Sequence, residues 1–146
     1  MLKGYYVNGF LYHEPTNQIL LQQLQSTSPS WSLFESEEVE ENTSPVATFA
    51  ELIHNTLQLK LVIKTIQEVY SYLNEEVNKN YSITYAPVTS LKTALATPRD
   101  GKIYKWFGPR EILKLNLSAQ TRHDVTVGQR VIDAKMRKLL GLHTFE

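Results

Sequence analysis

The sequence contains no cysteine among its 146 residues and no long run of hydrophobic residues. Without cysteine, the chain can form neither a disulfide nor a thiolate metal site, and it offers no thiol nucleophile. No apolar segment approaches the length of a membrane span. The first ten residues, MLKGYYVNGF, lack the basic and then apolar layout of a signal peptide, so a cytoplasmic protein without membrane contact is expected.

Familiar catalytic motifs are also missing. The sequence has no Gly-x-Ser-x-Gly elbow, no Walker A loop, no Gly-x-Gly-x-x-Gly stretch and no histidine pair at metal-ligand spacing. Nucleophilic catalysis by a serine therefore has little support from the sequence.

The composition indicates one folded domain spanning residues 1–146, because 42% of the residues are hydrophobic and 10% are aromatic. The net charge of zero is unevenly distributed. Residues 1–89 hold four Lys and Arg against ten Asp and Glu, whereas residues 90–146 hold eleven against five. The basic half could attract phosphates, or the two halves could complement each other within one fold. Nucleic acid is not the expected partner.

Alternating apolar residues predict strands at 3–13 and 18–24, joined by a turn at 14–17, with a bulge at Asn8-Gly9. A loop at 26–30 and a short strand at 31–35 follow. Two long strands, 60–73 and 80–88, form a second hairpin through the polar segment 74–80. A loop at 97–102, a strand at 103–107, a short helix at 110–115 and a final helix from about Thr121 to Gly141 complete the chain.

The segment 45–57 is predicted to be an amphipathic helix. Ser44 can cap it, and Pro45 suits its first position. The apolar residues of this segment, Phe49 and Ile53 among them, recur at helical spacing and form one face. Strand pairs together with this helix and the terminal helix predict an α+β domain, a mixed sheet with helices packed on its faces.

Four stretches in this order resemble a Nudix (MutT-like) hydrolase over nearly the whole chain. They are QILLQQ, WSLFESEEVEENTSPVATFAELIHNTLQL, IKTIQEVYSYLNEEVNKNYSITYAPV and WFGPREILKLNL. The resemblance implies a Nudix-like α/β/α sandwich, with a mixed β-sheet between helices. It also implies action on, or binding of, a nucleoside-diphosphate derivative, and formation of a homodimer.

The Nudix signature is degenerate in this sequence. When the signature is laid on the chain without a gap, its two glycines fall on Glu37 and Gln58, and its first glutamate falls on Thr43. Its Arg-Glu pair falls on Glu51 and Leu52. Its paired metal-binding glutamates fall on Asn55 and Thr56. Magnesium prefers charged oxygen ligands and gives up its water shell reluctantly. We therefore expect no metal at this helix and no resident cofactor.

Other carboxylates could rebuild a site for magnesium or manganese. The candidates are Glu40, Glu41, Glu51 and Glu68, which belong to different elements and could converge in the fold. The alternative is that these residues form an ordinary exposed acidic surface.

Ligand-binding candidates come from the aromatic residues and from the final helix. Tyr5, Tyr6 and Trp31 could stack on a nucleobase, or they could be core residues. Arg122 could bind phosphate or form a surface ion pair. His123 beside Asp124 could transfer protons, but Thr121 and Asp124 also have the spacing of a helix capping box, which we expect here.

Two functions follow as expectations. The first is a Nudix-fold protein that binds a nucleotide, a nucleoside-diphosphate derivative or a protein partner without canonical hydrolysis. The alternative is a divergent hydrolase of nucleoside diphosphates linked to another group, with a relocated site for magnesium or manganese.

Overall fold

The computed structural model describes residues 4–24, 30–91 and 102–141. The strands are β1 (Tyr5–His13), β2 (Gln18–Leu24), β3 (Trp31–Ser32), β4 (Phe34–Glu35), β5 (Gln67–Asn74), β6 (Lys79–Val88) and β7 (Lys102–Phe107), and the helices are α1 (Pro45–Leu57), α2 (Pro109–Ile112) and α3 (Ala119–Leu139). Short 3-10 turns occupy Glu14–Thr16 and Ile63–Thr65. No helix in the described part of the chain is long and apolar enough to cross a membrane.

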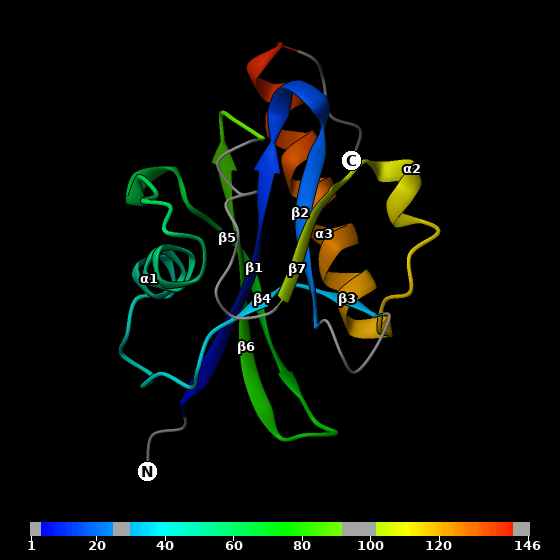
Figure 1. Ribbon diagram of the computed structural model, residues 1–146. Helices are drawn as coiled ribbons and strands as arrows, with labels where there is room; N and C mark the ends of the chain where they lie inside the picture. The colour runs from blue at the N-terminus through cyan, green and yellow to red at the C-terminus, as the bar shows by residue number, and fades with distance from the viewer. Residues whose placement is uncertain (1–3, 25–29, 92–101, 142–146) are drawn as a thin grey trace.

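The strands form one mixed sheet in the order β3-β2-β1-β6-β5, to which β4 is added beside β1 and β7 beside β2. The central pair, β1 and β6, is parallel, and the other pairs are antiparallel. Helix α1 covers one face of the sheet and α3 covers the other (Figure 1). The predicted α+β class, with a mixed sheet between helices, is confirmed.

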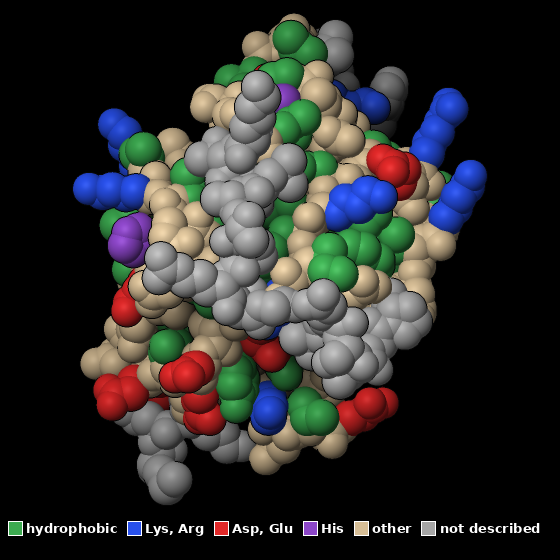
Figure 2. Space-filling view, viewed as in Figure 1, with side chains coloured by type: hydrophobic (Ala, Val, Ile, Leu, Met, Phe, Trp, Pro, Cys, Tyr) green, Lys and Arg blue, Asp and Glu red, His purple; other side chains and the backbone are tan. Residues whose placement is uncertain are grey.

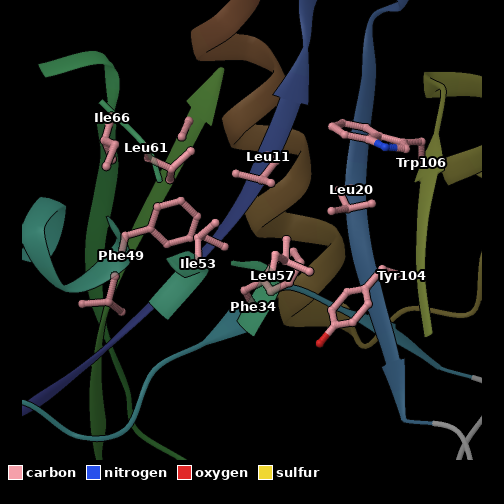
Figure 3. Close-up of a cluster of buried hydrophobic side chains, with 12 residues drawn as sticks. Leu11, Leu20, Phe34, Phe49, Ile53, Leu57, Leu61, Ile66, Tyr104 and Trp106 are labelled. Carbon is pink, nitrogen blue, oxygen red and sulfur yellow. The ribbon is translucent and has the colours of Figure 1, made fainter. Parts of the chain in front are cut away.

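Two hydrophobic clusters lie on opposite faces of the sheet because side chains alternate along each strand. On β1, Val7 and Leu11 face the α1 cluster, and Phe10 faces the α3 cluster. Phe49 and Ile53 of α1 are fully buried against the sheet, as predicted, and Figure 3 shows them beside Leu11. The helix that resembles the signature segment is therefore held in place by its apolar residues.

The bulge predicted at Asn8-Gly9 is wrong. Pairing between β1 and β6 continues without a break through this point, with Gly9 opposite Thr84. Glycine is needed there for space, since a Cβ atom on Gly9 would lie 2.5 Å from Cε1 of Phe49 and 2.5 Å from the Thr84 carbonyl oxygen. The irregularity occurs instead in the second hairpin, between Glu68 and Tyr70.

Both predicted hairpins form, with one difference in extent. The strand predicted at 60–73 begins only at Gln67, and the residues before it make a 3-10 turn that leaves Val62 and Ile63 56% exposed. Of the loops predicted at 26–30 and 97–102, residues 26–29 and 97–101 lie outside the described residues. Homodimer formation stays a prediction.

Candidate functional site

Helix α1 begins and ends as its sequence predicts. The Ser44 hydroxyl accepts a hydrogen bond from the Ala47 N–H at 3.2 Å, and Pro45 occupies the first turn, where no N–H is required. At the other end, the N–H of Gln58 donates to the His54 carbonyl at 2.9 Å. Gln58 has a left-handed backbone (φ 54°) that favours glycine, and the second signature glycine falls on this residue.

Helix α1 thus has the ends that its sequence predicts, and the residues onto which the ungapped alignment places the signature differ in their surroundings. Leu52 packs against the core cluster beneath α1. Glu51 and Asn55 are exposed, and Thr56 is half-buried. The apolar members of the helix are in the core, and Asn55 and Thr56, onto which the ungapped alignment places the paired glutamates, are neutral.

A cleft with a volume of about 910 Å³ lies beside the entry to α1. It is bounded by the loop before α1, the start of β1 and the β5–β6 hairpin. The polar residues in its wall include Tyr5, Glu41, Thr43, Glu68, Ser71 and Asn80. None of the helix positions Glu51, Leu52, Asn55 and Thr56 lines it.

The Tyr5 hydroxyl joins β1 to the loop before α1 by donating a hydrogen bond to the Thr43 carbonyl. Burial, assisted by the negative charge of Glu68, raises the pKa of Tyr5 above its ordinary value. The hydroxyl therefore stays neutral at physiological pH. Its hydrogen is occupied, and its oxygen remains able to accept a hydrogen bond from a ligand.

The four substitute carboxylates proposed from the sequence are only partly brought together. Glu41 and Glu68 line the same cleft, whereas Glu40 belongs to a neighbouring hollow of about 460 Å³ and Glu51 lines neither. Within residues 4–24, 30–91 and 102–141, no three His, Cys, Asp or Glu side chains group closely enough to hold a metal ion.

The predicted aromatic candidates differ in their contacts. Tyr5 lines the cleft, but Tyr6 does not. The Tyr6 ring lies tilted against Tyr81 with ring centroids 5.5 Å apart, and the Lys79 ammonium lies 4.8 Å from the Tyr6 ring centre. Trp31 packs edge-on against Phe107 at 4.8 Å. Tyr6 and Trp31 are thus engaged in contacts within the protein.

Arg122 and His123 do not face the cleft either. The Arg122 guanidinium donates to the carbonyls of Ile112, at 3.3 Å, and Leu115, at 2.7 Å, and so ties α3 to the segment around α2. His123 is exposed, and its ring lies edge-on to Tyr70 at 6.0 Å.

The capping box predicted at Thr121 and Asp124 is wrong. Helix α3 begins at Ala119, two residues earlier than predicted, and its cap is Ser118, whose hydroxyl accepts from the Thr121 N–H at 3.1 Å. Asp124 lies on the buried face of the helix and is only 2% exposed. It cannot act as a dyad with His123, since that neighbour points outward.

Asp124 is the centre of a polar cluster that sequence reasoning missed. Its carboxylate accepts hydrogen bonds from the Tyr70 hydroxyl, from Gln120 Nε2 at 2.9 Å and, more weakly, from the Tyr72 hydroxyl at 3.4 Å. Burial raises the pKa of Asp124, and the hydrogen bonds oppose that rise. One signal was available, because Asp124 shares helical spacing with the buried Gly128 and Ile132.

Comparisons with known proteins point to one fold. No protein-family model and no curated protein matches the sequence. Among solved structures, a mutT/nudix family protein from Listeria innocua superposes with a TM-score of 0.69 at 17% identity, covering 96% of this chain and 99% of that one. The NUDIX domain of Shewanella oneidensis NrtR, solved in complex with ADP ribose, gives 0.64 at 13% identity and 90% coverage of both chains.

A third structure, the E. coli ORF135 protein, gives a TM-score of 0.66 at 15% identity, covering 92% of this chain and 94% of that one. At such identities the likeness is one of fold. The chain has the fold of the MutT/Nudix proteins, as the sequence resemblance predicted.

Proposed function

We propose that this Nudix-fold chain binds a nucleotide-type small molecule in the cleft beside α1 and does not perform magnesium-dependent cleavage of a diphosphate. The proposal rests on the side chains and the backbone of α1. Its apolar residues and the left-handed backbone at Gln58 are retained, while Leu52, Asn55 and Thr56 stand where the family signature has metal-binding carboxylates. Magnesium in such hydrolases neutralises the diphosphate and activates a water, and neutral side chains hold it poorly.

The cleft supports binding in two ways. Its volume of about 910 Å³ is within the range of small-molecule sites. Tyr5, Thr43, Ser71 and Asn80 surround it with groups that donate or accept hydrogen bonds, so a hydroxylated ligand could be oriented there. The structurally similar NrtR domain was solved with ADP ribose, a ligand of this general kind.

The test measures binding and cleavage separately. Calorimetric titration with ADP-ribose, ADP and adenosine in the presence of a chelator should detect binding of at least one compound. Phosphate-release assays with magnesium or manganese should stay at background. Ser71→Phe, which fills the cleft from an exposed position on β5, should abolish binding, whereas Ala134→Phe on the exposed face of α3 should not. Chelator-sensitive cleavage by the unmodified protein would refute the proposal.

A divergent hydrolase is the second candidate, and one observation favours it: Glu41 and Glu68 line the same cleft. If they helped to hold magnesium or manganese, Glu41→Gln and Glu68→Gln would each reduce chelator-sensitive phosphate release. Glu51→Gln is the matched control, since Glu51 is exposed on α1 and does not line the cleft.

A further inference from the structure

The charged side chains that line the cleft beside α1 are all acidic. Of the described residues in its wall, Glu41 and Glu68 are acidic, and none is Lys, Arg or His. The two glutamates approach the cleft from different elements, Glu41 from the loop before α1 and Glu68 from β5. A ligand in the cleft therefore meets negative charge from two directions.

Acidic side chains also dominate the surroundings of the cleft, where Lys79 beside Tyr6 is an opposing positive charge. The loop before α1 carries Glu37, Glu38 and Glu40 besides Glu41, and acidic side chains gather over this loop at the lower left of Figure 2. The neighbouring hollow is lined by Glu38, Glu40 and Glu41. Phosphate groups placed here would be repelled, while a positively charged group would be attracted.

The neutral groups in the wall suit the same kind of ligand. The Tyr5 hydroxyl has used its hydrogen on the Thr43 carbonyl, so it presents an acceptor oxygen to the cleft. The Asn80 and Ser71 side chains add further acceptor oxygens. Tyr5 lies on the α1 side of the sheet, whereas the side chains of Tyr70 and Tyr72 point to the opposite side, where their hydroxyls meet Asp124. The acceptor oxygens of the cleft match a donor-rich organic cation.

We infer that the cleft receives a positively charged organic group, an ammonium carried on a nucleoside-type ligand, and not the phosphates of a nucleotide. The inference rests on the proposed function, because it specifies what chemistry the same cleft selects. Glu41 and Glu68 supply the charge, and Tyr5 supplies an additional acceptor.

Three ligands that differ only at the 5′ position test this inference. They are 5′-amino-5′-deoxyadenosine, which carries a protonated amine, neutral adenosine, and AMP, which carries a phosphate. In chelator and low salt, the amine should bind about fivefold or more tighter than adenosine, and AMP should bind most weakly. The preference for the amine should shrink in high salt.

Variants locate the effect in the cleft. Glu41→Gln and Glu68→Gln should each weaken binding of the amine more than binding of adenosine, and so reduce the preference for the amine. Glu51→Gln, an exposed change on α1 outside the cleft, should leave the preference intact. An amine preference that persists fully in both cleft variants would overturn the assignment of these glutamates.

The remaining outcomes separate the two proposals. If AMP binds more tightly than the amine in chelator, the inference about charge is overturned, while binding of nucleotide-type ligands stands. If none of the three compounds binds, the inference fails, and the proposed function fails with it only when ADP-ribose and ADP do not bind either. Thermal unfolding of each variant establishes that a loss of binding is not a loss of fold.

Discussion

The Tyr70 hydroxyl of β5 donates a hydrogen bond to the Asp124 carboxylate of α3. β5 is the last strand in the sheet order and also forms one wall of the cleft. Asp124 is buried and receives Gln120 and Tyr72 as further donors. The carboxylate thus fastens the strand to the helix that covers the face opposite α1, and the position of the cleft wall depends on it.

Asp124→Ala should lower the free energy of unfolding by about 2–3 kcal/mol, because it leaves the partly buried hydroxyl of Tyr70 without its partner. Urea denaturation measures the change. Asp133→Ala is the matched control, an exposed aspartate on the same helix, and should shift stability by no more than about 0.5 kcal/mol. Equal effects of the two substitutions would contradict a special role for Asp124.

The stability of the protein should carry a pH dependence from Asp124. Burial raises the pKa of this carboxyl in the folded state above its ordinary value of 3.8. Between the two values the folded state binds more protons than the unfolded state, so this contribution is fully present below the ordinary pKa and is lost as pH rises through the raised one.

Denaturation titrations of the wild-type protein and of Asp124→Asn measure this contribution. As the pH falls from neutral to about 4, the wild type should gain unfolding free energy relative to the variant, which lacks the titrating group. A difference between the two proteins that is constant with pH would show that the carboxyl titrates alike in both states.

Gly9→Ala should destabilise the protein by about 1–3 kcal/mol, since its Cβ would meet both the Phe49 ring and the backbone oxygen of Thr84. The backbone oxygen cannot move aside without disturbing the pairing of β1 with β6. Gly108→Ala provides the comparison, because the nearest atom to its Cβ would be 3.7 Å away. Thermal or chemical unfolding of both variants tests the difference, and a tolerated Gly9→Ala would show that the strands can separate easily.

Gln58→Gly should raise the free energy of unfolding by about 0.5–1 kcal/mol, because Gln58 holds a left-handed backbone that glycine adopts without strain. Asn78→Gly is the comparison, at a site of similar backbone (φ 53°), because asparagine already tolerates this conformation well. Chemical denaturation of both variants provides the measurement. A loss of stability in Gln58→Gly would mean that its side-chain bond to the Asn55 carbonyl outweighs the strain.

Placing carboxylates at three positions of α1 should create metal affinity. The triple variant Leu52→Glu, Asn55→Glu and Thr56→Glu should bind manganese or magnesium more tightly than the wild type, because charged oxygens offset the removal of water from the ion. Isothermal titration and metal-dependent thermal shifts measure the gain. Cleavage need not return, since Glu37 and Gln58 still replace the signature glycines. Equal metal affinity of the two proteins would mean that this helix does not present the positions as the signature alignment assigns them.

Much of the fold is readable from local sequence. The apolar spacing of Phe49 and Ile53, the cap at Ser44 and the proline after it determine α1 almost to the residue. Alternation and turn residues likewise identify both hairpins. These features depend on neighbours a few positions away, so a single sequence contains them. The neutral residues Asn55 and Thr56 on α1 are equally plain, and they determine the expectation about metal.

Only the tertiary structure decided which distant residues meet. The parallel pairing of β1 with β6 joins segments far apart in the chain, and it makes Gly9 a point of close packing where local pattern suggested a bulge. The tertiary structure brings Glu41 and Glu68 to one cleft and leaves Glu40 and Glu51 out of that cleft. It also buries Asp124 against Tyr70, where helix-start chemistry suggested a cap. Periodicity records which face a side chain occupies, but the partner across that face is set by the packing of the whole sheet.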